Sequence, residues 1–194
     1  LRLMEAYARF YARDGKAKEA LEVIDRAAEV APERPSLLTL KQDIKAGKAI
    51  QPMFADARTG AAEVLFGLGS AVRRDGSEGF AIMYLQLALA ANPGSDVTLI
   101  QLAGIAENQD RQTEAIVLYD KVAKDSPFRR GAELQSGLNL ADMDKKDDAV
   151  RTLSALIEEN PSDTRAYLAL GGVHASAKDY KSAAEVYERA IAAI

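Results

Sequence analysis

The sequence predicts an all-α protein, built as an array of antiparallel helix pairs and interrupted by one half-repeat. Two sets of residues recur every 34 positions: the prolines Pro93, Pro127 and Pro161, and the alanines Ala81, Ala115, Ala149 and Ala183. Within each period the apolar residues are spaced by three and four, which is typical of helical faces, and no alternating strand pattern of useful length occurs. A fixed period of this length is typical of repeat arrays.

Composition narrows the classes of function. The chain has 194 residues, of which 48% are hydrophobic and 28% charged, so it can bury a core. Its formal net charge of −4 provides no basic field for nucleic acid. No apolar run approaches the roughly 18 residues of a membrane helix, so we expect no membrane insertion. The absence of cysteine excludes disulfides, thiol catalysis and thiolate metal sites.

The first helix pair is predicted over residues 1–34. The chain starts at Leu1 inside a predicted helix, and residues 183–194 are still predicted to be helical. We therefore expect a fragment of a longer chain, in which the lack of a targeting segment carries no information. Arg2, Arg9 and Arg13 share one helical face with Glu5, and we expect them to form a solvated surface, as we do Arg73 and Arg74.

The period breaks between Pro32 and Pro93, which are 61 residues apart. Residues 35–60 are predicted to form a half-repeat helix, ending near Gly47, and an irregular connector, with the next helix opening at Ala61. Two interpretations of the connector stay open. Either it is a packed loop that replaces a lost helix, or Ile50, Met53 and Phe54 lie in the groove of the array or against a neighbouring domain.

Four contiguous units are predicted over residues 61–194, at 62–95, 96–129, 130–163 and 164–194. Gly69, Gly137 and Gly171 fall in the middle of predicted helices, where each costs about 1 kcal/mol of helix propensity. We expect a close approach to the following helix, around its recurring alanine, to compensate that cost. A large residue at Ala115 or Ala149 would then overpack the crossing.

The units resemble the tetratricopeptide repeat (TPR) family. The resemblance rests on a motif that two units show most clearly. In the 164–194 unit its residues are Tyr167, Leu170, Gly171, His174, Ala183, Tyr187 and Ala190. In the 96–129 unit they are Leu99, Leu102, Ala103, Ala106, Ala115, Tyr119, Val122 and Pro127. It implies a right-handed superhelical solenoid. Glu133 and Ser136 depart from the pattern at normally apolar positions, which makes the 130–163 unit the weakest.

A second, weaker resemblance is to long bacterial TPR proteins of the cell envelope, whose activity is unsettled. It rests on residues 60–66, 84–89 and 126–130. It favours the periplasm or cell envelope over the cytoplasm, and localisation is otherwise unknown.

In a TPR superhelix the first helix of each unit lines the concave surface, and this resemblance selects a candidate peptide-binding groove. The candidate residues are Phe66, Ser70, Ile100, Gln101, Gly104, Leu134, Gln135, Leu138, Leu168 and Gly172. One interpretation is that the apolar rows only thicken the core. The other is a groove for an extended or helical apolar peptide, in which Gln101 and Gln135 hydrogen-bond its main chain. The charged residues of the chaperone-binding carboxylate clamp of the family are absent from these rows.

No residue pattern predicts catalysis, a cofactor or a metal. His174, the only histidine, stands at an inward aromatic position of the motif and is interpreted as packing. Residues 67–70 lack the lysine of a phosphate-binding loop. Residues 142–148 resemble a calcium loop, but Asp147 occupies the glycine position and Leu153 the position of the final glutamate, so we interpret them as an interhelical turn.

The predicted function is therefore a protein–protein interaction scaffold, not an enzyme, that binds a peptide or partner segment in the concave groove. One alternative is structural: end helices with an exposed stripe at Val186, Ala190 and Ile194 would drive homo-oligomerisation. Another is a regulatory arm of an enzyme whose catalytic domain lies outside this segment. The predicted partners are proteins or peptides, without nucleic acid.

Overall fold

A computed structural model describes residues 1–72 and 78–193, and these residues form eleven helices and no strand. The chain divides into two compact units, Leu1–Val64 and Leu65–Ile194. The predictions at Arg73, Arg74 and Ile194 fall outside the described residues. Among the described residues, none of the helices has the length and apolar character needed to cross a bilayer.

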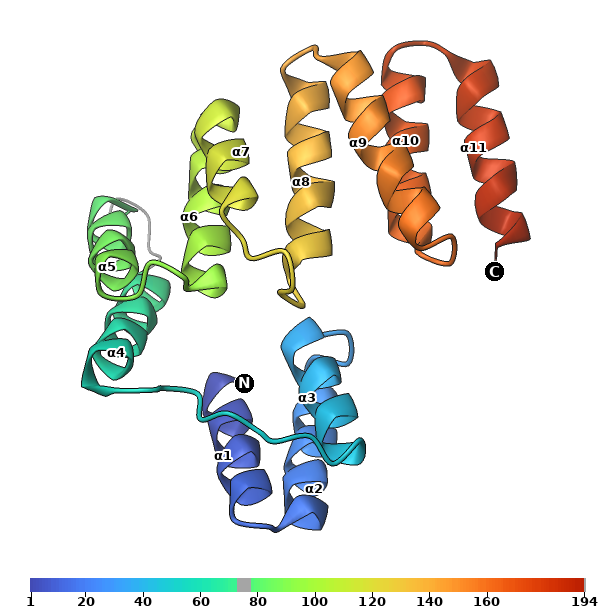
Figure 1. The fold of residues 1–194 in the computed structure, drawn as a ribbon. Coiled ribbons are helices and arrows are strands. Elements are labelled where there is room, and N and C mark those ends of the chain that lie inside the picture. Colours follow the sequence, from blue (N-terminus) through green and yellow to red (C-terminus); the bar gives the residue numbers. More distant parts are fainter. Residues whose placement is uncertain (73–77, 194) are drawn as a thin grey trace. The chain divides into compact units, whose positions relative to one another are not determined.

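The N-terminal unit contains a helix pair and a third helix, α1 (Arg2–Arg13), α2 (Ala17–Ala28) and α3 (Pro35–Lys45), followed by the connector (Figure 1). Pro35 is the first residue of α3, a position at which a backbone N–H would have no acceptor within the helix, so proline costs no hydrogen bond there. Ile24, Leu37 and Leu40 are each 2% exposed and form the core of this unit with fully buried Ala8.

Helix α4 (Ala57–Ala71) begins four residues earlier than the predicted start at Ala61. The reason is a reciprocal cap: the Thr59 amide donates to Asp56 Oδ1 at 2.8 Å, and the Asp56 amide donates to Thr59 Oγ1 at 3.1 Å. Hydrogen bonds from Thr59 also hold the pKa of Asp56 below its usual value. Gly60 lies inside the helix and does not mark its start.

The C-terminal unit continues as successive helices. They are α5 (Glu78–Ala91), α6 (Asp96–Asn108), α7 (Gln112–Asp120), α8 (Arg129–Asp142), α9 (Lys146–Glu159), α10 (Thr164–Ser176) and α11 (Tyr180–Ala192). From α6 onward each helix packs on the next one, as Figure 1 shows. The prolines of the 34-residue set fall in the turns that follow α5, α7 and α9, because proline cannot continue the helical hydrogen-bond ladder.

Three mid-helix glycines lie at close helix crossings. A Cβ at Gly137 would lie 2.8 Å from Leu153 Cδ2, and one at Gly171 would overlap Cε1 of the Tyr187 ring. At Gly69 it would lie 2.8 Å from Leu85 Cγ. The close approach is therefore real, but the side chain opposite each glycine is four residues beyond the recurring alanine.

A polar network ties α6, α7 and α8 together. The Tyr119 hydroxyl donates to Glu107 Oε2 at 3.1 Å, and Asn139, only 3% exposed, donates from Nδ2 to Glu107 Oε1. Burial, assisted by the Glu107 carboxylate, raises the pKa of Tyr119. The tyrosine therefore stays a neutral donor at physiological pH.

The apolar stripe predicted on the last helix is not exposed. Val186 is 5% exposed and Ala190 is 7% exposed, because both pack into the core that α9, α10 and α11 share. The prediction of an exposed self-association stripe at these two residues is wrong. The large apolar side chains that α11 does expose are Tyr180 and Ile191, at 68% and 74%.

Candidate peptide-binding groove

The ten predicted groove residues lie on the first helices of four pairs, α4, α6, α8 and α10. They differ in what covers them. Ile100 packs against the hydrophobic core centred on α6 and α7, and Leu134 packs against the core that α9, α10 and α11 share. Both are half-buried, whereas Leu168 is 60% exposed. Part of the apolar row therefore thickens the core, as the first interpretation had it, and part of it is open to solvent.

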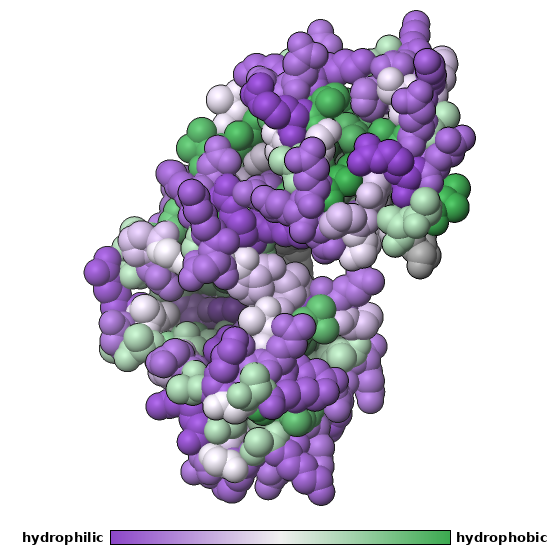
Figure 2. Space-filling view, turned by 45° about the vertical axis from the view of Figure 1, so that its right-hand side comes forward, coloured by the Kyte–Doolittle hydropathy of each residue, from purple (hydrophilic) through white to green (hydrophobic). Residues whose placement is uncertain are grey.

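The open part is a groove between α8 and α10. Leu138, Leu168 and Gly172 line a hollow of about 390 Å³ together with Ala169 and Val173. The structure thus brings three of the ten predicted residues around one space. Figure 2 shows a face of the molecule on which hydrophilic residues predominate, with hydrophobic residues gathered in smaller areas between them.

Two glycines of the predicted rows have no packing role. A Cβ at Gly172 would meet nothing within 4 Å, and one at Gly104 would meet only Glu107 Oε2, at 4.0 Å. This contrasts with Gly171, directly beside Gly172, where a Cβ would run into Tyr187. Glycine in a helix costs about 1 kcal/mol relative to alanine, and at Gly104 and Gly172 no internal contact offsets that cost.

Polar side chains of the rows are partly free to bind. Ser70 Oγ lies 2.8 Å from both Phe66 O and Gln101 Oε1, and it donates to one of them at a time. Within the described residues, the amide nitrogen of Gln101 and the side-chain amide of Gln135 have no hydrogen-bond partner. Both side chains are half-buried, so a bound main chain could use them without much loss of side-chain freedom.

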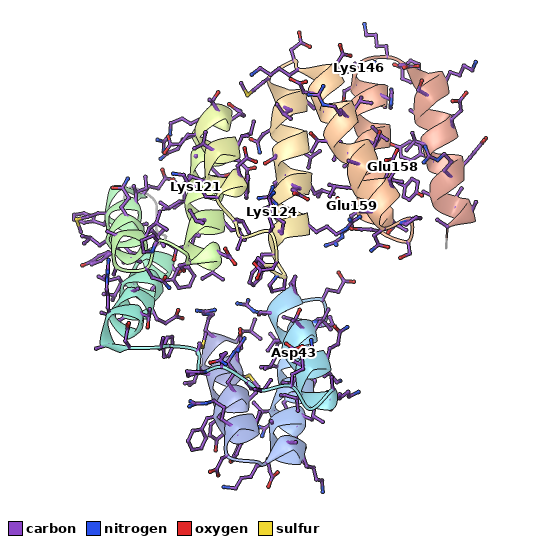
Figure 3. All side chains as sticks on the ribbon, viewed as in Figure 1. Asp43, Lys121, Lys124, Lys146, Glu158 and Glu159 are labelled. Carbon is purple, nitrogen blue, oxygen red and sulfur yellow. The ribbon has the colours of Figure 1, made fainter. Side chains whose placement is uncertain are left out.

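Charged residues that the sequence predicts only as part of an interhelical turn lie at one end of the hollow. Asp142, Asp144 and Lys146 line it. Lys146, labelled in Figure 3, begins α9 and reaches Asp179 Oδ2 at 3.8 Å. Neither aspartate carboxylate is hydrogen-bonded within the described part of the chain. The 34-residue register could have identified these residues as part of the groove. It places their turn next to the C-terminal ends of the helices that carry the groove residues.

The corresponding face of the N-terminal unit is already covered. Residues of the 48–56 connector and of α1 line one shallow cavity, with Met53 and Phe54 opposite Ala6 and Arg9. Arg9 Nη1 donates to Gln51 O at 3.4 Å, and Ile50 packs against the core of this unit. The connector is therefore packed against α1 of its own unit.

Two of the three arginines of α1 depart from the predicted solvated surface: Arg2 and Arg9 are half-buried in ion pairs, whereas Arg13 is exposed as predicted. Arg2 pairs with Glu63, and Arg9 Nη2 donates to Glu5 Oε1 at 3.2 Å. Glu5 is buried and also accepts from Ser36 Oγ, at 3.0 Å. The register of the repeat places Glu5, Ala6 and Arg9 at the positions of Phe66, Gly67 and Ser70, so this unit uses its groove rows internally.

The histidine lies beside a carboxylate rather than in a catalytic set. His174 Nδ1 lies 3.2 Å from Asp179 Oδ2, and Asp179 also accepts from the Ser182 amide as the cap of α11. Over residues 1–72 and 78–193, no three histidine, aspartate or glutamate side chains gather in a way that could hold a metal ion.

Part of the chain matches the model of a known repeat family. Residues 134–194, which span the α8–α11 pairs and the open groove, match the family model described as tetratricopeptide repeat. This segment belongs to the TPR family. The predicted resemblance and the all-α TPR fold are thereby confirmed, and the matching family is a repeat family, not a catalytic one.

Solved TPR structures share the fold over almost the whole chain. MamA superposes with a TM-score of 0.58 and 16% identity, over 99% of this chain and 90% of MamA. PilW, a widely conserved type IV pilus biogenesis factor, gives a TM-score of 0.54 and 16% identity, over 99% of this chain and 76% of PilW. A TPR protein from Parabacteroides merdae gives 0.58 and 17%, over 98% of this chain and 65% of its own. Comparison with curated protein sequences found no match. The TPR repeats support a scaffold that binds protein partners.

Proposed function

We propose that this TPR scaffold binds an extended peptide segment of a partner protein in the groove between α8 and α10. The apolar side chains of the peptide would pack on Leu138 and Leu168. Its main chain would pass over the glycine at position 172 and hydrogen-bond to the free amide of Gln135.

The observation that carries the proposal is that Gly172, in the lining of the hollow, faces open space. Glycine is disfavoured inside helices because it costs helix propensity, and at Gly171 the ring of Tyr187 accounts for its presence. Gly172 has no such neighbour, yet it lies in the floor of the hollow. A missing side chain at this place lets a ligand backbone approach the helix closely.

In the N-terminal unit an extended segment of the same chain already lies against the equivalent helix face, and this supports the proposal. There the connector lies against the equivalent face of α1, its Gln51 carbonyl accepts from Arg9, and its apolar side chains pack nearby. An extended chain can therefore satisfy both its polar and its apolar groups on this kind of surface.

A set of substitutions tests the groove without disturbing the core. Leu168→Glu and Gly172→Leu alter solvent-facing positions, whereas Ile100 and Leu134 also pack on the cores and are poorer choices. Gly131→Leu is the matched control, because Gly131 is an exposed glycine of α8 with nothing within 4 Å of its would-be Cβ and lies outside the hollow.

Peptides selected from a random phage library on the wild-type chain are the probe. We expect Leu168→Glu and Gly172→Leu to weaken their binding at least about tenfold, since buried anchors dominate such interfaces, and Gly131→Leu to leave it unchanged. Circular dichroism checks that all three variants are folded. Equal binding by all three variants, or no selected peptide at all, would contradict the proposal.

A further inference from the structure

The 130–163 unit departs from the repeat pattern at two neighbouring positions of α8. In α6 these positions hold Leu99 and Leu102, which are 1% and 8% exposed. In α10 they hold buried Tyr167 and Leu170, but in α8 they hold Glu133 and Ser136. Two large apolar side chains are thus replaced by a carboxylate and a small hydroxyl where adjacent pairs stack.

The exchange leaves a pocket. A cavity of about 420 Å³ opens between α7, α8 and α9, and it shares no lining residue with the groove between α8 and α10. Ile116, Leu140 and Leu156 supply apolar wall. Ser136 also lines it and is only 6% exposed. Its Oγ is buried and has no hydrogen-bond partner among the residues that the structure describes.

An unpartnered buried hydroxyl is costly, because it has lost its water without gaining a protein partner. A side chain that merely filled space would be apolar here, as it is in α6 and α10. The hydroxyl in the pocket wall therefore points to a polar group that enters the pocket from outside.

The charged side chains that line the pocket indicate which charge the ligand group carries. Arg129 is already used: its Nε donates to Glu133 Oε1 at 2.6 Å, and its Nη1 donates to Asp120 O and Val122 O at 3.0 and 2.9 Å. Arg129 thereby caps α7, which is nine residues long, against fourteen for α5 and α9.

Some carboxylate oxygens in the lining of the pocket have no hydrogen-bond donor among the described residues. Asp120 and Glu159 line the pocket at the C-terminal residues of α7 and α9, where the helix dipoles add negative potential. In the described part of the chain, Asp120 Oδ1 and Oδ2 and Glu133 Oε2 have no hydrogen-bond donor. Glu159, labelled in Figure 3, has Arg130 Nη1 at 3.9 Å. The other lining cation, Arg151, donates to Asp148 at 2.6 Å and has a side chain that is 77% exposed.

We propose that this pocket binds a primary alkylammonium group. The ammonium donates to Ser136 Oγ and to the free carboxylate oxygens, and its methylenes pack on Ile116, Leu140 and Leu156. A lysine side chain of a protein partner and a small free amine share this chemistry. The site shares no lining residue with the groove, so binding at each place can be tested separately in the same protein.

In the test, the 194-residue chain is titrated with n-pentylammonium and, at equal ionic strength, with n-pentanol, and amide NMR shifts are followed. We expect saturable shifts at residues 116–159 and affinity for the amine about tenfold above that for the alcohol, because a charged group gains more from each hydrogen bond. Asp120→Asn should weaken the amine about tenfold. Asp147→Asn, at an exposed carboxylate outside the pocket, should leave it unchanged.

Ser136→Leu restores the apolar residue of the other units and should abolish binding by filling the pocket. N-acetyl-lysine methylamide distinguishes the sources: if it binds as the free amine does, a lysine side chain fits, and if only the free amine binds, the ligand is a small amine. Lack of saturable binding, equal binding of pentanol, or an affinity unchanged by Asp120→Asn would overturn the proposal. The last outcome does not depend on the folding of Ser136→Leu.

Discussion

Replacing a helical glycine by alanine should have opposite effects at two positions of this protein. Gly137 and Gly172 both lie in the middle of first helices, α8 and α10, and neither has a positive φ. Gly137 faces the fully buried Leu153, whereas Gly172 faces open space. The pair therefore separates the helix propensity of alanine from the closeness of the helix crossing.

The magnitudes follow from these contacts. Alanine gains about 1 kcal/mol of helix propensity at either position. At Gly137, however, the new Cβ would lie 2.8 Å from Cδ2 and 2.9 Å from Cγ of Leu153, which is 0% exposed and cannot swing into solvent. Overpacking of this kind costs about 1–3 kcal/mol. We expect Gly172→Ala to stabilise the protein by about 1 kcal/mol and Gly137→Ala to be destabilising by about 0–2 kcal/mol.

Urea unfolding followed by far-UV circular dichroism measures both variants against the wild type. The difference between the two, about 1–3 kcal/mol, contains only the overpacking, because the propensity gain cancels. If both variants are stabilised equally at unchanged m-value, α8 and α9 do not cross closely at Gly137, and the reasoning for the three packed glycines fails.

Two further outcomes follow from the same packing and from one capped helix. Ala149→Leu should lower the free energy of unfolding by about 1–3 kcal/mol, because Ala149 is 0% exposed in the core that α9, α10 and α11 share. Thermal unfolding compares it with Ala184→Leu, a control at an exposed position of α11, and an unchanged midpoint for Ala149→Leu would contradict this. Burial acts to raise the pKa of Asp163, but hydrogen bonds from Arg165 and Arg130 outweigh it and hold that pKa below its usual value. The resulting stability is present at neutral pH and is lost as the pH falls below about 4, so the stability of Asp163→Asn should depend less on pH in that range, and parallel acid-unfolding curves would refute this.

Much of the fold could be predicted from local patterns. The 34-residue period and the spacing of apolar residues determine the helix pairs, and Pro35 begins α3 where the sequence placed it. The sequence predicts the start of α4 too late, after Gly60, because Asp56 and Thr59 form a cap with threonine at the position where glutamate is usual. Helix α7 ends at Asp120, whose carbonyl accepts a hydrogen bond from Arg129, nine residues further along the chain, and no local pattern predicts that bond.

The candidate groove could be predicted only as a set of positions. The register selects Ile100, Leu134 and Leu168 as one row, and nothing in the sequence distinguishes them. The structure does: the first two pack on cores, and the third is open. The same limit explains the error at Val186 and Ala190, whose burial depends on how closely α9 and α10 approach α11.

The amino-acid sequence by itself determined where the helices recur and which face of each is apolar, because helical periodicity and capping act over a few residues. Only the tertiary structure decided which apolar faces are covered, which glycines meet a side chain, and where the exchange of leucine for Ser136 leaves a pocket. The physical reason is that exposure at any one position is set by side chains from other helices, which lie tens of residues away along the chain.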